Sequence, residues 1–221
     1  MIREFGEHAL LVELDDWTAA QGLAASLRAE PIRGVEATVP ALGSLLVELD
    51  PDAAELIDDV AEILRRRLDV VPSEPPRGRV RTIPVVYGGD HGPDLADAAV
   101  ACGMTPDELA TRHAATQVRV LFCGFAPGFP YLGELPEGLR VPRLPTPRTL
   151  TPSGSVAIAG AMTGIYPAEL PGGWRVIGRT SLMLFDPGRE PPAYLAPGDT
   201  VRWRPITAGE WPDAPAPADD W

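Results

Sequence analysis

The first 70 residues alternate between strand-like and helical hydrophobic patterns. Residues 8–14 (HALLVEL) have the apolar, partly β-branched composition of a strand. After Asp16, which is a suitable N-cap, apolar residues recur at helical spacing on one face until Pro31. The residues of this face are Ala20, Leu23, Ala24 and Leu27. The pattern predicts a strand followed by a helix.

The next segments predict a hairpin and a second helix. Residues 35–39 and 44–49 are short strand-like runs separated by Pro40 and Gly43. Asp50 and Pro51 then provide a cap and a first-turn proline for a helix. Its apolar residues recur every three or four positions at Ile57, Val60, Ala61, Leu64 and Leu68. With a further strand expected in residues 79–87 (RVRTIPVVY), this order matches the split βαβ pattern of a small α+β domain.

The second half of the chain has the pattern of a turn-rich β domain. Thr105 begins a capping box with Pro106 and Glu108, which predicts a helix running to the region of His113. From residue 118 short strand-like runs alternate with turns up to Pro205. Between residues 121 and 180 the chain holds 10 of its 22 glycines and 9 of its 26 prolines. This favours a short-stranded barrel or sandwich.

These patterns divide the chain into three parts. Residues 71–79 (VPSEPPRGR) have three prolines and little to bury, which is typical of a linker. We therefore expect a small α+β domain over 1–79 and a mainly-β domain over 80–206. Residues 207–221 are acidic and rich in proline, and we expect them to form a mobile tail.

Composition excludes several classes of protein. The net charge of the 221 residues is −12. A protein that binds nucleic acids or anionic membranes needs a basic surface, so the charge argues against both kinds of binding. All 19 basic residues are arginine, because the chain contains no lysine, and it contains no asparagine. The missing lysine excludes a P-loop, a Schiff base and a Ser-Lys nucleophile in the isolated chain. The missing asparagine excludes an N-glycosylation site and a Cys-His-Asn triad.

The cysteines and the N-terminus point to a reducing compartment. Cys102 and Cys123 have neither a CxxC motif nor histidines at metal-ligand spacing, so we expect free thiols and no metal site. The N-terminus is acidic where a signal peptide would be basic, and no apolar run is long enough for a membrane span. We expect a cytoplasmic protein.

Charge and aromatic residues concentrate candidate chemistry in the turn-rich segment. Residues 121–180 hold five arginines and three acidic residues, so this segment is locally positive, which is weak evidence for an anionic ligand. In residues 124–135 (GFAPGFPYLGEL), glycines and prolines surround Phe125, Phe129 and Tyr131. The pattern fits a structural corner or a ligand platform.

Further along this segment, two more features leave alternatives open. Arg143 and Arg148 converge only if the extended chain between them bends. Ser155 shares one strand face with Ala157 and Ala159, and this small face leaves room for a ligand or for close packing. The three histidines favour structural or solvated roles by their spacing. Among them His113 is notable because it precedes the glycine-rich strand.

Several longer motifs in fixed order carry a specific resemblance to a known family. They include YGGDHGPDL (87–95), GFAPGFPYLG (124–133), PRLPTPR (142–148), PSGSVAIAG (152–160), TGIYP (163–167), PGGWRVIGRT (171–180), LFDP (184–187) and LAPGDTVRW (195–203). Across essentially its whole length the chain resembles the family of 5-oxoprolinase B subunits, which is also described as the sporulation-kinase inhibitor family or as allophanate hydrolase subunit 1. One departure is Met162, where related sequences often carry a glutamine.

The resemblance implies a fold, a reaction and partners. The fold is an α+β N-terminal domain followed by a cyclophilin-like β-barrel. The implied partners are the C and A subunits of 5-oxoprolinase, which together with this chain hydrolyse 5-oxoproline to glutamate with ATP, while the isolated chain is inactive. ATP, with Mg²⁺, is expected at a site that a partner subunit shares or supplies.

The resemblance also carries over a set of candidate site residues. The implied catalytic residues are His113, Arg148, Ser155 and Arg179. The implied substrate-binding residues are Tyr131, Arg143, Thr163, Tyr166 and Trp174. Among them, the arginines are expected to bind carboxylate or phosphate oxygens, and Ser155 and Thr163 to donate hydrogen bonds.

Two alternative functions follow from the other names of the family. One is a regulator that binds and inhibits a sensor histidine kinase, which would need an exposed apolar patch on the barrel. The other is an accessory subunit of an allophanate or urea-type amidohydrolase. Because the Ser-Ser-Lys chemistry of such amidases needs a lysine, that activity would have to reside in another polypeptide.

Overall fold

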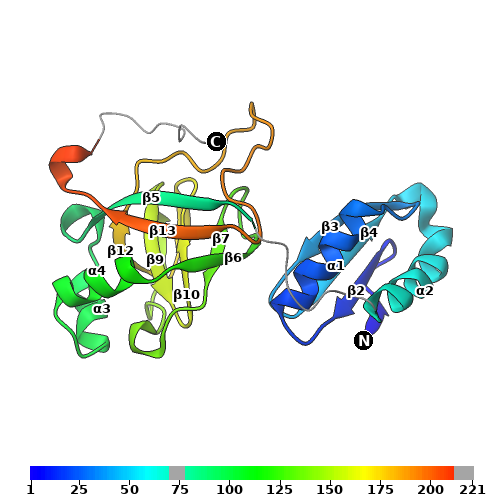
Figure 1. The fold of residues 1–221 in the computed structure, drawn as a ribbon, viewed down its shortest axis with the longest axis horizontal. Helices are drawn as coiled ribbons and strands as arrows, with labels where there is room; N and C mark the ends of the chain where they lie inside the picture. The colour runs from blue at the N-terminus through cyan, green and yellow to red at the C-terminus, as the bar shows by residue number, and fades with distance from the viewer. Residues whose placement is uncertain (70–77, 212–221) are drawn as a thin grey trace. The chain divides into compact units, whose positions relative to one another are not determined.

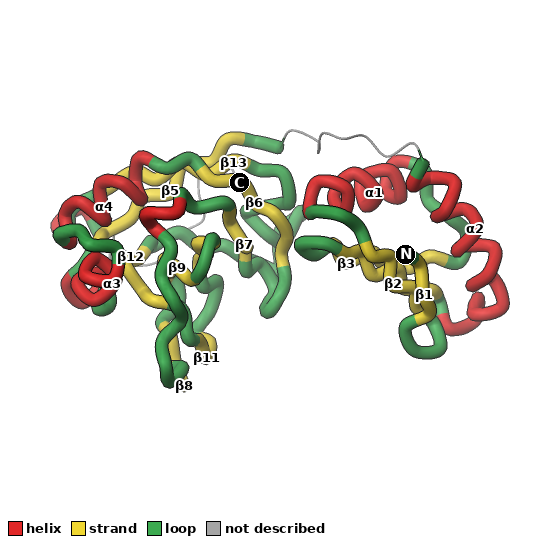
Figure 2. Tube along the Cα trace, turned by 90° about the horizontal axis from the view of Figure 1, so that it is seen from below, coloured by secondary structure: helices red, strands yellow, loops and turns green. Residues whose placement is uncertain are grey.

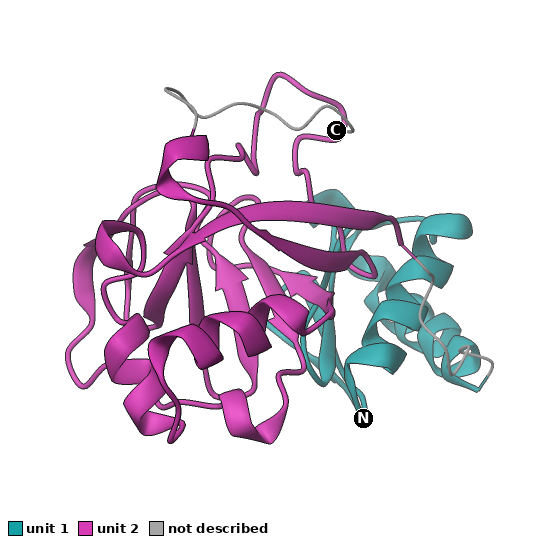
Figure 3. Ribbon diagram, turned by 60° about the vertical axis from the view of Figure 1, so that its left-hand side comes forward, with its two compact units in different colours: residues 1–77 teal, residues 78–221 magenta. Residues whose placement is uncertain are grey.

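The computed structural model describes residues 1–69 and 78–211 of the chain. The chain divides into two compact units, residues 1–77 and 78–221 (Figure 3). Residues 70–77, which make up most of the predicted linker, lie outside the described residues. Across the described ranges, none of the helices combines the length and apolar character that a bilayer crossing requires.

The first unit is a four-stranded antiparallel sheet with two α-helices (Figure 1). Its elements are β1 (Ile2–Glu4), β2 (Ala9–Glu13), α1 (Trp17–Ala29), β3 (Val35–Pro40), β4 (Ser44–Leu49) and α2 (Ile57–Leu68). The strand order is β1-β2-β4-β3. β4 lies between β2 and β3 and is antiparallel to both. The strands β2 and β3, which α1 connects, therefore run parallel to each other. Alternate residues of β2 and β4, such as Leu10 and Leu45, are buried in one core with residues of both helices, such as Leu23 and Leu64.

The cap predicted for the first helix is confirmed. The Asp16 carboxylate accepts hydrogen bonds from the backbone N–H groups of Thr18 and Ala19, each at 2.9 Å. This satisfies two of the four N–H groups that a helix start leaves unpaired. The predicted apolar face is also buried in the structure, with Leu23 fully inaccessible.

The second helix begins later than the sequence pattern predicts. Asp50 accepts a hydrogen bond from the Asp52 N–H, but residues Pro51–Leu56 form a 3₁₀ helix before α2 begins at Ile57. The reason is local, because Ala53 has a φ of −117°, which lies outside helical geometry and interrupts the ladder. The hairpin predicted before it is confirmed as the antiparallel pair β3–β4.

The further strand predicted for the small domain belongs instead to the second unit. β5 (Val80–Tyr87) pairs in parallel with β13 (Thr200–Pro205) and in antiparallel with β12 (Arg175–Arg179). Its residues Ile83 and Val85 are fully buried in the core of that unit, which explains the placement. In the first unit, the additional strand is the short β1 at the N-terminus, whose three residues are too few to show a periodicity.

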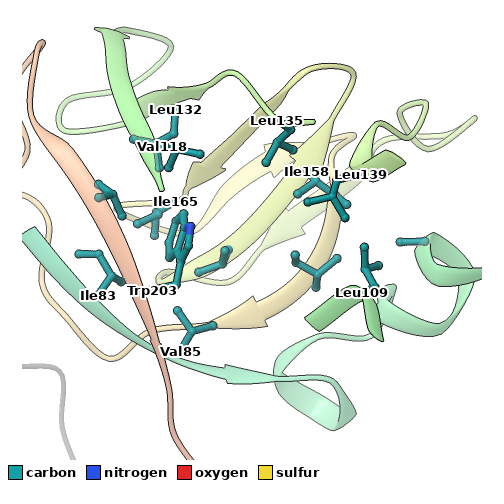
Figure 4. Close-up of a cluster of buried hydrophobic side chains, with 14 of the residues drawn as sticks. Ile83, Val85, Leu109, Val118, Leu132, Leu135, Leu139, Ile158, Ile165 and Trp203 are labelled. Atoms are coloured by element: carbon teal, nitrogen blue, oxygen red, sulfur yellow. The ribbon is translucent and has the colours of Figure 1, made fainter. Parts of the chain in front are cut away.

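The second unit is built on a closed seven-stranded barrel, which has no free sheet edge to pair with other chains. The strand order is β10-β7-β6-β13-β5-β12-β9. The strands not yet given are β6 (Val118–Cys123), β7 (Pro130–Gly133), β9 (Ser155–Ala159) and β10 (Met162–Ile165). Figure 4 shows side chains such as Ile83, Leu132, Ile165 and Trp203 in the buried cluster.

Two helices and a short ribbon complete the second unit. α3 (Leu95–Ala101) and α4 (Pro106–Ala115) lie beside each other (Figure 2). The predicted capping box of Thr105 and Glu108 is present at the start of α4. β8 (Arg148–Thr151) and β11 (Leu170–Gly172) form a separate antiparallel ribbon that projects from the barrel in the same view. Short 3₁₀ helices occur at Gly89–His91, Glu137–Leu139 and Ala208–Glu210.

The predicted mobile tail does not begin at residue 207. Thr207 and Glu210 form a capping box around the last 3₁₀ helix, and the Trp211 ring packs on His91 with a centroid distance of 4.5 Å. Residues 212–221, the rest of the predicted tail, lie outside the described residues. Cys102 and Cys123 are both free thiols, as expected.

A glycine in the turn before β9 allows a test of the barrel packing. Gly154 has a φ of +79°, and a Cβ at this position would overlap the Thr180 carbonyl oxygen. We expect Gly154→Ala to lower the free energy of unfolding by about 3 kcal/mol, because left-handed strain and overpacking add. Gly160→Ala is the matched control, since Gly160 also has a positive φ but nothing within 4 Å. Urea unfolding should show a smaller loss, about 1 kcal/mol, for the control; equal losses would contradict the packing argument.

Candidate functional site: an aromatic pocket on the barrel wall

Cross-strand pairing creates a shallow floor on the outside of the barrel. Tyr131, Gly164, Ala157 and Val176 are successive neighbours on β7, β10, β9 and β12. Side chains paired across strands share a face, so these four positions point the same way. Because the two central residues are glycine and alanine, the floor is low at its centre.

Aromatic rings cover this floor. Phe129 meets the rings of Tyr166 and Trp174 edge to face, with centroids 5.2 and 5.9 Å apart, and Trp174 also meets Tyr131 at 5.7 Å. A Cβ at Gly164 would lie 3.1 Å from both the Phe129 and the Trp174 ring, so the glycine permits this close approach. The small face of β9 is thus used for close packing at Ala157 and Ala159, which settles the alternative left open by the sequence.

The aromatic rings border a small pocket. Its volume is about 120 Å³. We call it the aromatic pocket, and its lining residues are Phe125, Phe129, Tyr131, Arg143, Tyr166, Pro171, Gly172, Gly173 and Trp174. A site of this size accommodates a small molecule or one part of a larger one.

One cation and two phenols supply the polar groups of the aromatic pocket. Arg143 is exposed and forms no ion pair with any residue that the structure describes. Burial raises the pKa of both Tyr131 and Tyr166 above the ordinary value, although the Arg143 charge acts in the opposite direction. Both phenols therefore stay neutral near pH 7. The half-buried Tyr131 can donate a hydrogen bond to a ligand, whereas Tyr166 is 2% exposed and its hydroxyl faces the Trp174 backbone. Arg143 can bind a carboxylate or a phosphate.

Arg148 is directed away from the aromatic pocket. Its Nη2 atom forms an ion pair with the buried Asp94 carboxylate at 2.5 Å, and it does not line the pocket. The chain between Arg143 and Arg148 is held by a hydrogen bond from the Leu144 N–H to the Gly173 carbonyl, at 2.7 Å. Of the two arginines, Arg143 therefore lines the aromatic pocket and Arg148 does not.

Ser155 and Arg179 are neighbours on β9 and β12 but also lie outside the pocket lining. The Arg179 Nε atom donates to the Ser153 carbonyl at 2.7 Å, and its guanidinium lies 5.6 Å from the Trp211 ring centroid. Ser155 is 1% exposed, and its hydroxyl has no hydrogen-bond partner among the described residues. Neither residue is presented to the aromatic pocket.

His113 and Thr163 lie inside the barrel, in a hydrogen-bonded chain. The Tyr87 hydroxyl is 2.8 Å from His113 Nδ1, His113 Nε2 is 3.1 Å from Thr163 Oγ1, and Thr163 Oγ1 donates to the Ala157 carbonyl. Since the Thr163 proton goes to that carbonyl, we assign the imidazole proton to Nε2, and Tyr87 then donates to Nδ1. Both His113 and Thr163 are 0% exposed. Neither residue lines the aromatic pocket, and we interpret both as structural.

The aromatic pocket thus brings together Tyr131, Arg143, Tyr166 and Trp174 from the predicted set. Sequence reasoning left Phe125 and Phe129 open between a structural corner and a ligand platform, and it did not single out Tyr87 or Asp94. A signal exists for Phe125, which is 59% exposed and has a φ of +69°. Such strain in a bulky residue is often found at functional sites, but it is not visible in a sequence.

The buried imidazole predicts a pH-dependent stability. Burial lowers the pKa of His113 from 6.5 to about 3, so below pH 6.5 the unfolded chain binds a proton that the folded chain does not. The stabilisation is complete above pH 6.5 and falls by about 1.4 kcal/mol per pH unit below it. We expect the unfolding free energies of the protein and of His113→Gln, which cannot titrate, to converge by about 2 kcal/mol between pH 7 and 5. Urea titrations at both pH values measure this; parallel pH dependences would contradict it.

Comparison with known proteins identifies relatives along the whole chain. A family model described as carboxyltransferase domain, subdomain C and D, matches residues 1–195. The 5-oxoprolinase B subunit of Escherichia coli O157:H7 is 42% identical over 215 residues, which cover 92% of this chain and 95% of that protein. The 5-oxoprolinase B subunit of Bacillus subtilis (strain 168) is 33% identical over 226 residues, covering 95% and 94%.

Solved structures share the fold. The crystal structure of TTHA0988 has a TM-score of 0.77 at 35% identity and covers 97% of this chain, but the match spans only 42% of that longer chain. The urea amidolyase of K. lactis has a TM-score of 0.74 at 19% identity, covering 95% of this chain and 15% of that chain. At that identity the second likeness concerns the fold alone.

Proposed function

Since this chain belongs to the family of 5-oxoprolinase B subunits, we propose that it is the B subunit of a heteromeric, ATP-dependent 5-oxoprolinase. The proposed reaction converts 5-oxoproline, ATP and water to glutamate, ADP and phosphate. Phosphorylation of the lactam oxygen makes the ring carbon electrophilic. One water then attacks this carbon and the C–N bond breaks, which leaves an acyl phosphate of glutamate, and a second water hydrolyses the acyl phosphate to release phosphate. In this proposal the chain acts with the A and C subunits and is inactive alone, and its closed barrel is of the cyclophilin-like type.

The chemistry of the aromatic pocket is the observation that supports this substrate most directly. 5-Oxoproline is a small ring with two methylene groups, a lactam and a carboxylate. The aromatic walls suit the methylenes, Arg143 at the pocket suits the carboxylate, and the neutral phenol of Tyr131 suits the lactam oxygen. A volume of about 120 Å³ favours a ligand of this size over a nucleotide.

We propose that ATP is held by a partner subunit or at a surface shared with one. The chain has no lysine for the β- and γ-phosphates. Over residues 1–69 and 78–211, no three His, Cys, Asp or Glu side chains are grouped to hold a metal ion. The Mg²⁺ that accompanies ATP would accordingly be bound through the nucleotide and the partner. This chain would contribute arginine and neutral hydrogen-bond donors.

The comparisons also bear on partners. The match to 42% of the longer TTHA0988 chain supports a unit that works beside additional protein. No specific observation favours inhibition of a sensor histidine kinase, because the exposed Phe125 already belongs to the aromatic pocket. None favours an amidohydrolase, whose catalytic lysine the chain lacks.

Reconstitution tests the proposed function. The chain is combined with the A and C subunits, and phosphate release from ATP is measured with and without 5-oxoproline, omitting each of the three proteins in turn. We expect 5-oxoproline-dependent hydrolysis only when all three are present. A complete complex that hydrolyses ATP equally without 5-oxoproline, or does not hydrolyse it at all, would overturn the proposal.

A further inference from the structure

Asp94 is a buried carboxylate with partners on two different elements. It directly precedes α3 and is 6% exposed. One carboxylate oxygen pairs with Arg148 Nη2 at 2.5 Å, and the other accepts the Val176 N–H at 2.7 Å. The Asp94 N–H in turn donates to the Val176 carbonyl at 2.9 Å. A single residue therefore binds the β8–β11 ribbon, through Arg148, and strand β12, through Val176.

These two anchors lie close to one wall of the aromatic pocket. Arg148 is the cross-strand partner of Gly172, and Val176 is the second residue of β12. Residues 171–174 line the pocket, and we call them the pocket wall. Asp94 thus acts on the pocket wall at Gly172, through Arg148, and two residues after its end, at Val176.

On the side of β12 that faces β5, Asp94 supports the strand next to the pocket wall, while β9 pairs with β12 on the other side. The pairing of β12 with β5 covers only Gly178 and Arg179, so beside Val176 the Asp94 backbone and carboxylate take the place of a strand. Arg148 depends on the same carboxylate, because its Nη1 atom is buried without a partner among the described residues. Loss of the carboxylate would leave a partly buried guanidinium unpaired.

We propose that Asp94 is a positioning residue for the aromatic pocket. Asp94 holds Trp174 and the rest of the pocket wall in place and thereby sets the affinity of the pocket for a small cyclic acid, 5-oxoproline. This inference rests on the proposed function for the identity of that acid. Asp94 does not line the pocket, so it acts only through Arg148 and Val176. Its effect should therefore appear in substrate binding and not in the chemistry of ATP.

Asp94→Asn tests the inference in the reconstituted complex. The amide oxygen can still accept the Val176 N–H, but the amide nitrogen cannot accept from Arg148. We expect the KM for 5-oxoproline to rise about tenfold, while kcat and the KM for ATP stay within about twofold, as when ground-state and transition-state binding weaken together. Adding Arg148→Gln should recover part of the loss, because the unpaired charge is removed.

Asp199→Asn is the matched control. Asp199 is also a buried aspartate, 4% exposed, and its carboxylate accepts the N–H groups of Arg79 and Ala196 at 2.7 and 3.0 Å. It precedes β13 and does not line the pocket. We expect this variant to leave the KM for 5-oxoproline unchanged. An equal rise in both variants would overturn the positioning role.

Hydrogen exchange of the isolated chain separates this inference from the proposed function. Asp94→Asn should accelerate amide exchange in residues 146–152 and 170–176, whereas Asp199→Asn should accelerate it around residues 196–201. If amide exchange changes as expected but the unaltered complex shows no 5-oxoproline-dependent activity, the proposed function is wrong. The inference that Asp94 positions the pocket wall is then still supported. The inference is overturned if the complex is active and Asp94→Asn leaves the KM for 5-oxoproline unchanged. It is also overturned if the amide exchange of residues 170–176 stays unchanged.

Discussion

Removing the Arg143 side chain should raise the KM for 5-oxoproline about 10- to 100-fold in the reconstituted complex. Arg143 is the cation in the lining of the aromatic pocket, and no ion pair within the described part of the chain competes for it. A hydrogen bond to a charged group is worth about 1.5–3 kcal/mol, and each 1.4 kcal/mol is a factor of ten in affinity. Steady-state kinetics of Arg143→Ala with varied 5-oxoproline at saturating ATP measure the change.

Two further variants test whether the effect comes from the Arg143 side chain itself. Arg140→Ala removes an exposed arginine of the same loop whose Nε atom donates to the Leu135 carbonyl, and it should leave the KM within about twofold. Arg143→Lys keeps the charge but loses the planar fork, so an intermediate KM is expected. If Arg140→Ala and Arg143→Ala have equal effects, the general charge of the loop matters and the proposed carboxylate contact is wrong.

His113→Ala should be the most destabilising substitution in the barrel core, with a loss of about 4 kcal/mol. The substitution removes a fully buried ring, which packs 4.8 Å from Trp203 by centroid, and leaves a cavity. It also removes the hydrogen-bond partner of both Tyr87 and Thr163. Differential scanning calorimetry of the full chain should show Tm falling by roughly 10 °C.

Activity measurements distinguish this structural role from catalysis. His113→Gln retains one donor and one acceptor, so at temperatures well below its Tm the kcat/KM of the complex should stay within about threefold of the unaltered protein. Loss of a general acid or base would instead lower the rate about 10²- to 10⁴-fold. A decrease of that size in a folded His113→Gln variant would restore the catalytic assignment.

The sequence predicted the elements whose causes are local. The caps of α1 and α4 depend on side chains within three residues of the helix start, and both were located correctly at Asp16 and Thr105. Strand β5 was misassigned because its alternation specifies a buried face but not the sheet that buries it. Its partner β13 follows at residue 200, and no local pattern connects the two.

The candidate site was predictable only in part, because its residues are selected by strand face and by tertiary contacts. Tyr131, Tyr166 and Trp174 share the outer face of the barrel wall, whereas Thr163 is one residue from Gly164 and so points inward. Arg143 and Arg148 look equivalent in the sequence. The Asp94 carboxylate, 54 residues before Arg148, withdraws only the second of them from the pocket.

The parallel pairing of β5 with β13 affects how the chain can acquire its structure during synthesis. Val80 pairs with Thr200, so the barrel closes only after nearly all of the described chain has left the ribosome. Pairings of such long sequence separation form late and slowly, whereas the first unit has all its strands within 49 residues and can fold early. Until β13 arrives, the edges of β5 and β6 stay open and can pair with strands of other chains.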